Sequence, residues 1–154
     1  MLNETALQEI QELKIRYPER ESALLPALYI AQREFGWLSN EALLHVANVL
    51  NLPEAKVRGT ASFYSMFKDK PAGRNIVQLC TNISCMIAGS DGLVNFLQTR
   101  YGMKPDETTP DGRFSLILME CIGACGTAPA MLVNTDFHEN LTEQNIGEIL
   151  ETYK

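Results

Sequence analysis

The stretch Asn75-Ile-Val-Gln-Leu-Cys-Thr-Asn-Ile-Ser-Cys85 decides the fold of this chain. Its first five residues form a short apolar run, which predicts a buried β-strand that leads directly into Cys80. A second apolar run, Phe114 to Met119, leads in the same way towards Cys121. If these two strands are neighbours in one sheet, the cysteines that follow them meet at one edge of that sheet.

The residues around the two strands predict a small mixed domain. Leu93, Phe96, Leu97 and Tyr101 recur at helical spacing and predict a helix over 91–101. The other expected elements are a turn at 110–112, a third strand over 130–133, a short strand near His138 and a helix that begins at Thr142. This order, βα then ββ then α, is typical of an α+β domain in which helices pack on a small sheet.

The residues before Pro71 predict helices only. The expected helices are one that ends at Tyr17 before Pro18, one capped by Ser22 and stopped by Gly36, one capped by Ser39, and a short one opened by Pro53 at its first helical position. Because Pro71-Ala72-Gly73 interrupts regular structure, we expect a domain boundary there. The predicted organisation is a helical N-terminal region over residues 1–70 and a mixed domain over residues 71–154.

The four cysteines form two pairs with the spacing of metal ligands. Four residues separate Cys80 from Cys85, and three separate Cys121 from Cys125. A [2Fe-2S] cluster needs four thiolates, two for each iron, so one cysteine pair per iron is the natural arrangement. The sequence therefore favours one [2Fe-2S] cluster on these four cysteines.

Three other interpretations of the cysteines stay open on spacing alone. A structural zinc ion also takes four thiolates, although its usual half-site is the tighter C-x2-C. The other two are a [4Fe-4S] cluster and unligated or redox-active thiols. Because the sequence has no C-x-x-C, a thioredoxin-type disulfide is disfavoured.

The residues around the cysteines suit a buried cluster. The loop Ile122-Gly-Ala-Cys-Gly126 can turn tightly at its glycines and aim backbone N–H groups at sulfur. We expect Ile122, Ala124, Met86 and Ile87 to exclude water from the cluster.

The charge and hydropathy of the chain exclude several classes of protein. The formal net charge is −6, which disfavours a nucleic-acid partner because a phosphate-binding surface needs the opposite sign. No run approaches the roughly 18 apolar residues of a membrane span, and the first residues lack the features of a signal peptide. We therefore expect a cytoplasmic protein without direct membrane insertion, whose cysteines are thiols or metal ligands.

Motifs for substrate chemistry are missing from the sequence. No G-x-G-x-x-G follows a strand and no P-loop occurs, so NAD and FMN, if used, are expected on another chain. His45 and His138 are expected to be structural or exposed. We expect no catalytic residues in this chain and no substrate chemistry from it alone.

Phe63, Tyr64, Met66 and Phe67 form an aromatic cluster just before the expected boundary. One interpretation is that this cluster packs the helical region onto the sheet domain. The other is that it is a docking surface for a partner subunit.

Four segments of the chain resemble one known family. They are Gly59-Thr-Ala-Ser-Phe-Tyr-Ser-Met-Phe67, Cys80-Thr-Asn-Ile-Ser-Cys85, Pro110-Asp-Gly-Arg-Phe114 and Cys121-Ile-Gly-Ala-Cys-Gly-Thr-Ala-Pro129. From about Phe35 to the last helix, the chain is similar to the 24 kDa subunit of respiratory complex I, known in bacteria as the E-type subunit of NADH-quinone oxidoreductase. The four cysteine positions show no departure from the family pattern.

The resemblance implies a thioredoxin-like [2Fe-2S] ferredoxin domain from about residue 74, with Cys80, Cys85, Cys121 and Cys125 as cluster ligands. It implies an electron-transfer subunit whose cluster exchanges an electron with the FMN of a partner, the flavin- and NADH-binding 51 kDa-type subunit. The chain is then a redox subunit of a larger respiratory complex, peripheral to the inner membrane.

Two alternatives to this role stay open. The chain could be the equivalent subunit of an NAD-linked hydrogenase or formate dehydrogenase, or else a structural zinc-binding interaction module. By analogy with thioredoxin-like folds, Pro129 is expected to follow a cis peptide bond.

Overall fold

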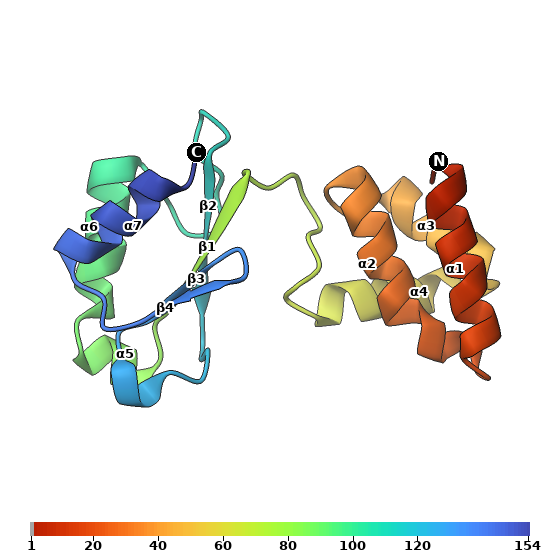
Figure 1. Cartoon of the computed structure of the whole chain (residues 1–154), viewed down its shortest axis with the longest axis horizontal. Coiled ribbons are helices and arrows are strands. Elements are labelled where there is room, and N and C mark those ends of the chain that lie inside the picture. The colour runs from red at the N-terminus through yellow and green to blue at the C-terminus, as the bar shows by residue number, and fades with distance from the viewer. Residues whose placement is uncertain (1) are drawn as a thin grey trace. The chain divides into compact units, whose positions relative to one another are not determined.

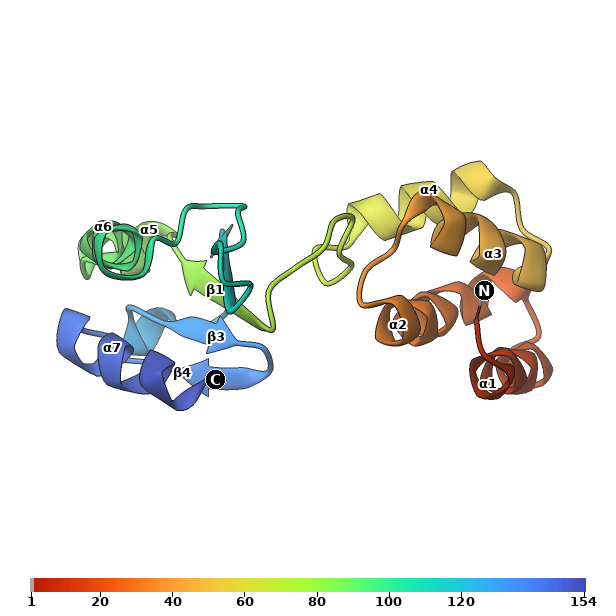
Figure 2. The same cartoon turned by 90° about the horizontal axis from the view of Figure 1, so that it is seen from above.

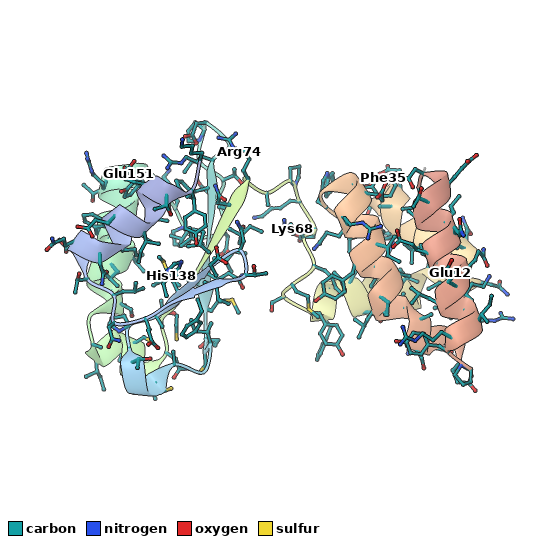
Figure 3. The ribbon with its side chains drawn as sticks, viewed as in Figure 1. Glu12, Phe35, Lys68, Arg74, His138 and Glu151 are labelled. Atoms are coloured by element: carbon teal, nitrogen blue, oxygen red, sulfur yellow. The ribbon has the colours of Figure 1, made fainter. Side chains whose placement is uncertain are left out.

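The computed structural model describes residues 2–154 and divides them into two compact units, one that ends at Pro71 and one that runs from Ala72 to Lys154. Figure 1 shows helices in the first unit and a sheet with helices in the second. The expected α+β class is confirmed. Lys68 and Arg74 lie on the segment that connects the two units (Figure 3).

The first unit is built from four α-helices within its described residues. They are α1 (Glu4–Arg16), α2 (Leu24–Phe35), α3 (Asn40–Leu50) and α4 (Glu54–Phe63), with a short 3-10 helix, η1 (Arg20–Ala23), between α1 and α2. The four helices expected from the sequence are confirmed. Gly36 stops α2 as predicted, because its φ of +77° is a left-handed conformation that glycine adopts without strain.

Two predicted helix starts need correction. Ser22 does not cap α2 but lies inside η1, where its N–H donates to the Glu19 carbonyl at 3.1 Å. The 3-10 helix runs directly into α2, so its N-cap is Ala23, which makes no side-chain capping bond. Pro53 is the N-cap of α4 rather than its first helical residue. Ser39 caps α3 as predicted.

The first unit has an apolar core of its own. Four apolar residues at helical spacing on α3 are buried: Leu43, Val46, Ala47 and Leu50. They pack with residues of α1 and α2, among them Ile10 and Leu28, which are fully buried. The amphipathic spacing of these helices therefore accounts for how they pack.

The aromatic cluster divides into one buried residue and three exposed ones. Phe67 belongs to the core of the helical unit, and its ring centroid lies 5.1 Å from that of Tyr29. The side chain of Gln32 holds the backbone on both sides of Phe67. Its amide N–H donates to the Met66 carbonyl at 3.0 Å, and its amide oxygen accepts from the Lys68 N–H at 2.6 Å. Phe63 is 79% exposed, and Tyr64 and Met66 are exposed as well. A docking role for these three residues stays a prediction.

The second unit is built on a four-stranded sheet in the order β2-β1-β3-β4. The strands are β1 (Asn75–Cys80), β2 (Phe114–Met119), β3 (Met131–Val133) and β4 (Asp136–His138). β1 runs parallel to β2, whereas β3 is antiparallel to both β1 and β4. All four expected strands are confirmed, and the two that lead into cysteines are neighbours.

Helices cover one face of this sheet. α6 (Ser90–Tyr101) and α7 (Glu143–Thr152) lie on the same side of it in Figures 1 and 2. Val77 and Leu79 of β1 form one buried cluster with Leu97 of α6 and Ile146 of α7. The strand that ends at Cys80 is therefore anchored in the core of the unit.

The sequence prediction misses one helix, α5 (Ile83–Ile87). Cys85 lies on this single helical turn, where no element was expected from the sequence. The side chain of Asn82 caps the turn by accepting the Ile83 N–H at 2.7 Å. Ile83, Met86 and Ile87 have the spacing of one helical face, but a single turn is too short for that spacing to stand out from a loop.

Two local predictions near the C-terminus are confirmed. The Ala128–Pro129 peptide bond is cis. Thr142 and Asn145 form a capping box at the start of α7, with each backbone N–H donating to the other residue's side chain at 2.7 and 3.2 Å.

Candidate metal centre

The first cysteines of the two pairs leave neighbouring strands at the same edge of the sheet. In the parallel pairing of β1 with β2, Cys80 lies opposite Met119, and Cys121 follows Met119 by two residues. The Cys80 N–H donates to the Ala130 carbonyl at 3.1 Å, and the Thr81 N–H donates to the Met119 carbonyl at 2.9 Å. Hydrogen bonds on both sides of β1 therefore set the position of Cys80.

Cys80 and Cys85 form a buried pair. Cys80 is 3% exposed and Cys85, on α5, is 2% exposed. The Cys80 Sγ lies 3.7 Å from the Glu120 carbonyl oxygen, directly before Cys121 in the chain. The first pair therefore sits against the backbone that leads to the second pair.

Cys121 and Cys125 are exposed, in contrast to the first pair. Gly123 turns the backbone between them at a φ of +82°, which would strain any other residue. Its N–H donates to the Cys121 Sγ at 3.4 Å. The expectation that this loop aims a backbone N–H at sulfur is therefore confirmed. Cys125 begins a short 3-10 helix, η2 (Cys125–Thr127).

The two pairs are close enough to influence each other. The pKa of the Cys85 thiol is raised above its ordinary value, first because burial disfavours the thiolate. The hydrogen bond and the charge of Cys80 raise this pKa further, and so does the charge of Cys125. α5 also contacts η2, and the two elements lie side by side in Figure 1. The structure therefore brings cysteines of both predicted pairs to one place.

The donors present fit a cluster with two cysteines on each iron. All four cysteines are free thiols. Within residues 2–154, no three His, Cys, Asp or Glu side chains gather as ligands around one metal ion. A [2Fe-2S] cluster asks for only two protein thiolates on each iron. Cys80 with Cys85, and Cys121 with Cys125, supply that number.

The surroundings of the cysteines are uncharged, but they are less shielded than expected. Residues 75–90 and 121–135 include no Asp, Glu, Lys, Arg or His. Ala124 is buried and Ile122 is half-buried, as expected of residues that exclude water. Met86 and Ile87 are instead 49% and 78% exposed, because they lie on the outer face of α5 while Cys85 lies on its inner face.

The two histidines lie apart from the cysteine-bearing segments in the chain. His45 is half-buried on α3. His138 ends β4 (Figure 3), and its Nε2 is hydrogen-bonded to the Tyr153 hydroxyl at 3.0 Å. The same hydroxyl donates to the Asp136 carboxylate at 2.8 Å. The contact with Tyr153 agrees with the structural role expected for His138.

Among residues 2–154, every helix is too short or too polar to cross a bilayer.

The sequence of this chain matches a known family and known proteins. A model of the family described as Thioredoxin-like [2Fe-2S] ferredoxin matches residues 10–154. The chain is 44% identical to an E-type subunit of NADH-quinone oxidoreductase of Rhizobium meliloti, over 97% of this chain and 89% of that protein. It is 38% identical to the mitochondrial NADH dehydrogenase [ubiquinone] flavoprotein 2 of Dictyostelium discoideum, over 96% of this chain and 61% of that protein.

A solved structure has the same fold. An NAD+-reducing [NiFe]-hydrogenase in the air-oxidized state matches 89% of this chain with a TM-score of 0.74 and 28% sequence identity. This chain spans 24% of the length of that hydrogenase chain. The family match begins within α1 and runs through the sheet to the last residue. The chain therefore belongs, through both of its units, to the thioredoxin-like [2Fe-2S] ferredoxin family.

Proposed function

We propose that this chain is the electron-transfer subunit of an NADH-quinone oxidoreductase, with Cys80, Cys85, Cys121 and Cys125 as the ligands of its one [2Fe-2S] cluster. The observation that carries the proposal is the register of β1 and β2, which brings the first cysteine of each pair to one sheet edge. The 44% identity to a subunit of such an oxidoreductase supports the choice of complex. When bound, such a cluster takes up and gives back single electrons.

The residues of this chain have two tasks at that site. The hydrogen bonds at the end of β1 hold Cys80, so the position of this proposed ligand is set by the sheet. The Gly123 N–H, aimed at the Cys121 sulfur, stabilises negative charge there and tunes the reduction potential. Because thiolates are the ligands, each thiol, including the buried Cys85, releases its proton when the cluster is assembled.

The electron partner, on this proposal, is the FMN of a separate NADH-binding chain of the 51 kDa type. The sequence supports a separate chain because it carries neither a dinucleotide-binding glycine motif nor a P-loop. The assembly is a larger respiratory complex, peripheral to the inner membrane on its cytoplasmic side.

A second candidate is the equivalent subunit of an NAD-linked hydrogenase. The TM-score of 0.74 to a solved NAD+-reducing hydrogenase favours it. The proteins that co-purify with this chain from its own cells distinguish the two candidates, since quinone-reducing subunits accompany one and hydrogenase subunits the other.

Spectroscopy of the full chain, purified without oxygen, tests the cluster. The expected protein is red-brown, contains about two irons and two sulfides per chain, and gives an S = 1/2 EPR signal after reduction by dithionite. A colourless protein that holds one zinc ion would overturn the proposal and favour the structural zinc-binding module.

Co-expression with the flavin-binding chain tests the division of labour. The pair is expected to co-purify, and NADH oxidation is expected only when the flavin-binding chain is present. NADH oxidation by this chain alone would contradict the proposal.

A further inference from the structure

We infer that the outer face of α5, formed by Ile83, Met86 and Ile87, is the surface on which the flavin- and NADH-binding chain docks. The inference rests on the proposed function and adds to it the place of contact. We call this surface the α5 face.

The α5 face is a contiguous group of exposed aliphatic side chains. Ile83 is 67% exposed, Met86 is 49% exposed and Ile87 is 78% exposed. Their spacing of three and four residues puts them together on one side of a helical turn. None of the three packs into the apolar core of the unit, which is made by other residues. Single exposed aliphatic residues are common on protein surfaces, but a group of this kind marks an interaction site.

The α5 face borders the cysteines that lie at the surface. Cys85 is on the inner side of the same helical turn, and α5 contacts η2, which begins at Cys125. Cys125 and Cys121 are themselves exposed. Electron transfer weakens steeply with distance, so the partner's flavin has to approach this edge. A chain that covers Cys121 and Cys125 therefore also covers neighbouring α5.

The charge distribution fits a protein partner at this place. The segments that carry the cysteines, residues 75–90 and 121–135, have no charged side chain, in a chain that is 21% charged overall. Exposed carboxylates flank them in the sequence at Asp91, Glu120 and Glu139. Charged residues are depleted at the centre of protein interfaces and return at the rim. The complementary partner surface is apolar at its centre and basic at its rim.

This pattern also distinguishes the flavin-binding chain from a second copy of the same chain. Two copies that met through their α5 faces would bring acidic rims together, and each copy carries a net charge of −6. Like charges placed opposite each other disfavour such an association. The occupant is therefore a different chain with basic groups around an apolar centre.

Two substitutions on the α5 face test the inference, together with a matched control. Ile83→Asp places a negative charge at the N-terminal end of α5, and Ile87→Lys places a positive charge at its C-terminal end. The polarity of the helix backbone favours each charge at its end, so we expect the helical turn to be preserved. Ile15→Glu on α1 replaces another exposed isoleucine by a charged residue; Ile15 is 87% exposed and lies in the helical unit. Each variant carries its cluster and is titrated with the FMN- and NADH-binding chain of the same complex.

Both α5 variants are expected to bind this partner roughly tenfold more weakly or worse, whereas Ile15→Glu binds like the wild type. The visible and EPR spectra of the cluster are expected to match the wild type in all three variants. The affinity loss, with unchanged spectra, separates a docking role from damage to the metal site.

The outcomes that contradict the inference are distinct from those that contradict the proposed function. If the wild type binds the flavin chain and both α5 variants bind it equally well, the α5 face is not the docking surface, and the proposed function stands. If the cluster-loaded wild type binds no flavin chain, the proposed function and the inference are both wrong. If sedimentation shows that the α5 substitutions break up a homodimer and leave flavin-chain binding intact, the occupant is a second copy and the inference is wrong.

Discussion

Cys80 and Met119 face each other across the parallel pair of β1 and β2, and this pairing sets where the second cysteine pair lies. Side chains alternate between the two faces of a strand, so a slip of one residue would turn Cys80 to the opposite face of the sheet. The apolar residues that alternate with it, Val77 and Leu79, are fully buried and would turn outward in such a slip. The burial of β1 therefore keeps Cys80, a proposed ligand, on its face of the sheet.

Removal of one proposed ligand is expected to remove the cluster. Cys121→Ala leaves three thiolates for two irons, so we expect most of the bound iron and sulfide, and the EPR signal, to be lost. The control is Ser84→Ala on α5, which lies beside Cys85 and is not a proposed ligand. Iron and sulfide analysis measures the result, and a full complement in Cys121→Ala would show that this ligand is wrongly assigned.

Gly73→Ala is expected to destabilise the second unit. A Cβ at Gly73 would lie 2.8 Å from the Phe114 carbonyl carbon, where β2 begins, and the backbone there cannot move freely. The Gly73 N–H also donates to the Ser115 hydroxyl at 2.8 Å, so a displaced chain would lose this bond. We expect a loss of about 1–3 kcal/mol in the free energy of unfolding, measured by chemical denaturation.

Gly92→Ala is the matched control for that substitution. A Cβ at Gly92, in α6, meets no atom within 4 Å. Alanine is a better helix former than glycine, so we expect no loss of stability or a gain of up to about 1 kcal/mol. Equal losses in the two variants would contradict the steric explanation.

Arg113 holds the end of the last helix. Its guanidinium donates to the Leu150 carbonyl at 2.9 Å and to the Tyr153 carbonyl at 2.7 Å, and it lies 4.6 Å from the centre of the Phe114 ring. Arg113→Met keeps the aliphatic stem and removes the donors, so we expect α7 to fray and stability to fall by about 1–2 kcal/mol.

Hydrogen exchange of the α7 amides measures this fraying. Arg100→Met, an exposed substitution on α6, is the control and should leave α7 protection unchanged. If the amides at the end of α7 exchange as fast in Arg113→Met as in the wild type, the hydrogen bonds from Arg113 to the two carbonyls contribute little to the stability of this helix end.

Tyr153 is expected to titrate late and to make stability depend on pH in alkaline solution. Burial raises the pKa of Tyr153 to about 12, and the hydrogen bond and charge of Asp136 add to this effect. The stability contribution is complete below the ordinary pKa of 10.0 and is lost as the pH rises towards 12, because the unfolded chain ionises first.

Tyrosinate absorbance measures the late titration of Tyr153. Denaturation at several alkaline pH values measures the loss of stability. Tyr153→Phe should lack the late ionisation step and should lose less stability across this pH range than the wild type. Identical titration curves for the two proteins would contradict the raised pKa.

The parts of the fold that the sequence predicted well are those where local pattern and tertiary burial agree. The strand over Phe114–Met119 was predicted with the bounds that the structure has, because an apolar run lies between a turn and a polar residue. The buried stripe of α3 follows its helical spacing in the same way. Ser22 misled the prediction because it is a good capping residue placed inside a 3-10 helix, where the preceding turn makes a cap unnecessary.

Two features of the site could not be predicted from the sequence. Single-turn helices such as α5 have too few residues for a periodic pattern to stand out from a loop. The pairing of β1 with β2, and the burial of Cys80 and Cys85 in contrast to Cys121 and Cys125, depend on contacts between segments more than 30 residues apart. The cysteine types and spacing were sufficient to propose four ligands, but only the sheet shows that Cys80 and the segment leading to Cys121 lie on neighbouring strands.

The order of the two cores along the chain has a consequence during synthesis. The last residue of the helical core, Phe67, leaves the ribosome before Cys80, so the first unit can fold before any thiol is exposed. At about 5–20 residues per second, Cys125 then follows Cys80 by roughly 2–9 s. During that interval the nascent chain presents an incomplete set of thiols. If the four cysteines are the ligands, as proposed, the complete set of thiols exists only after Cys125 has been made.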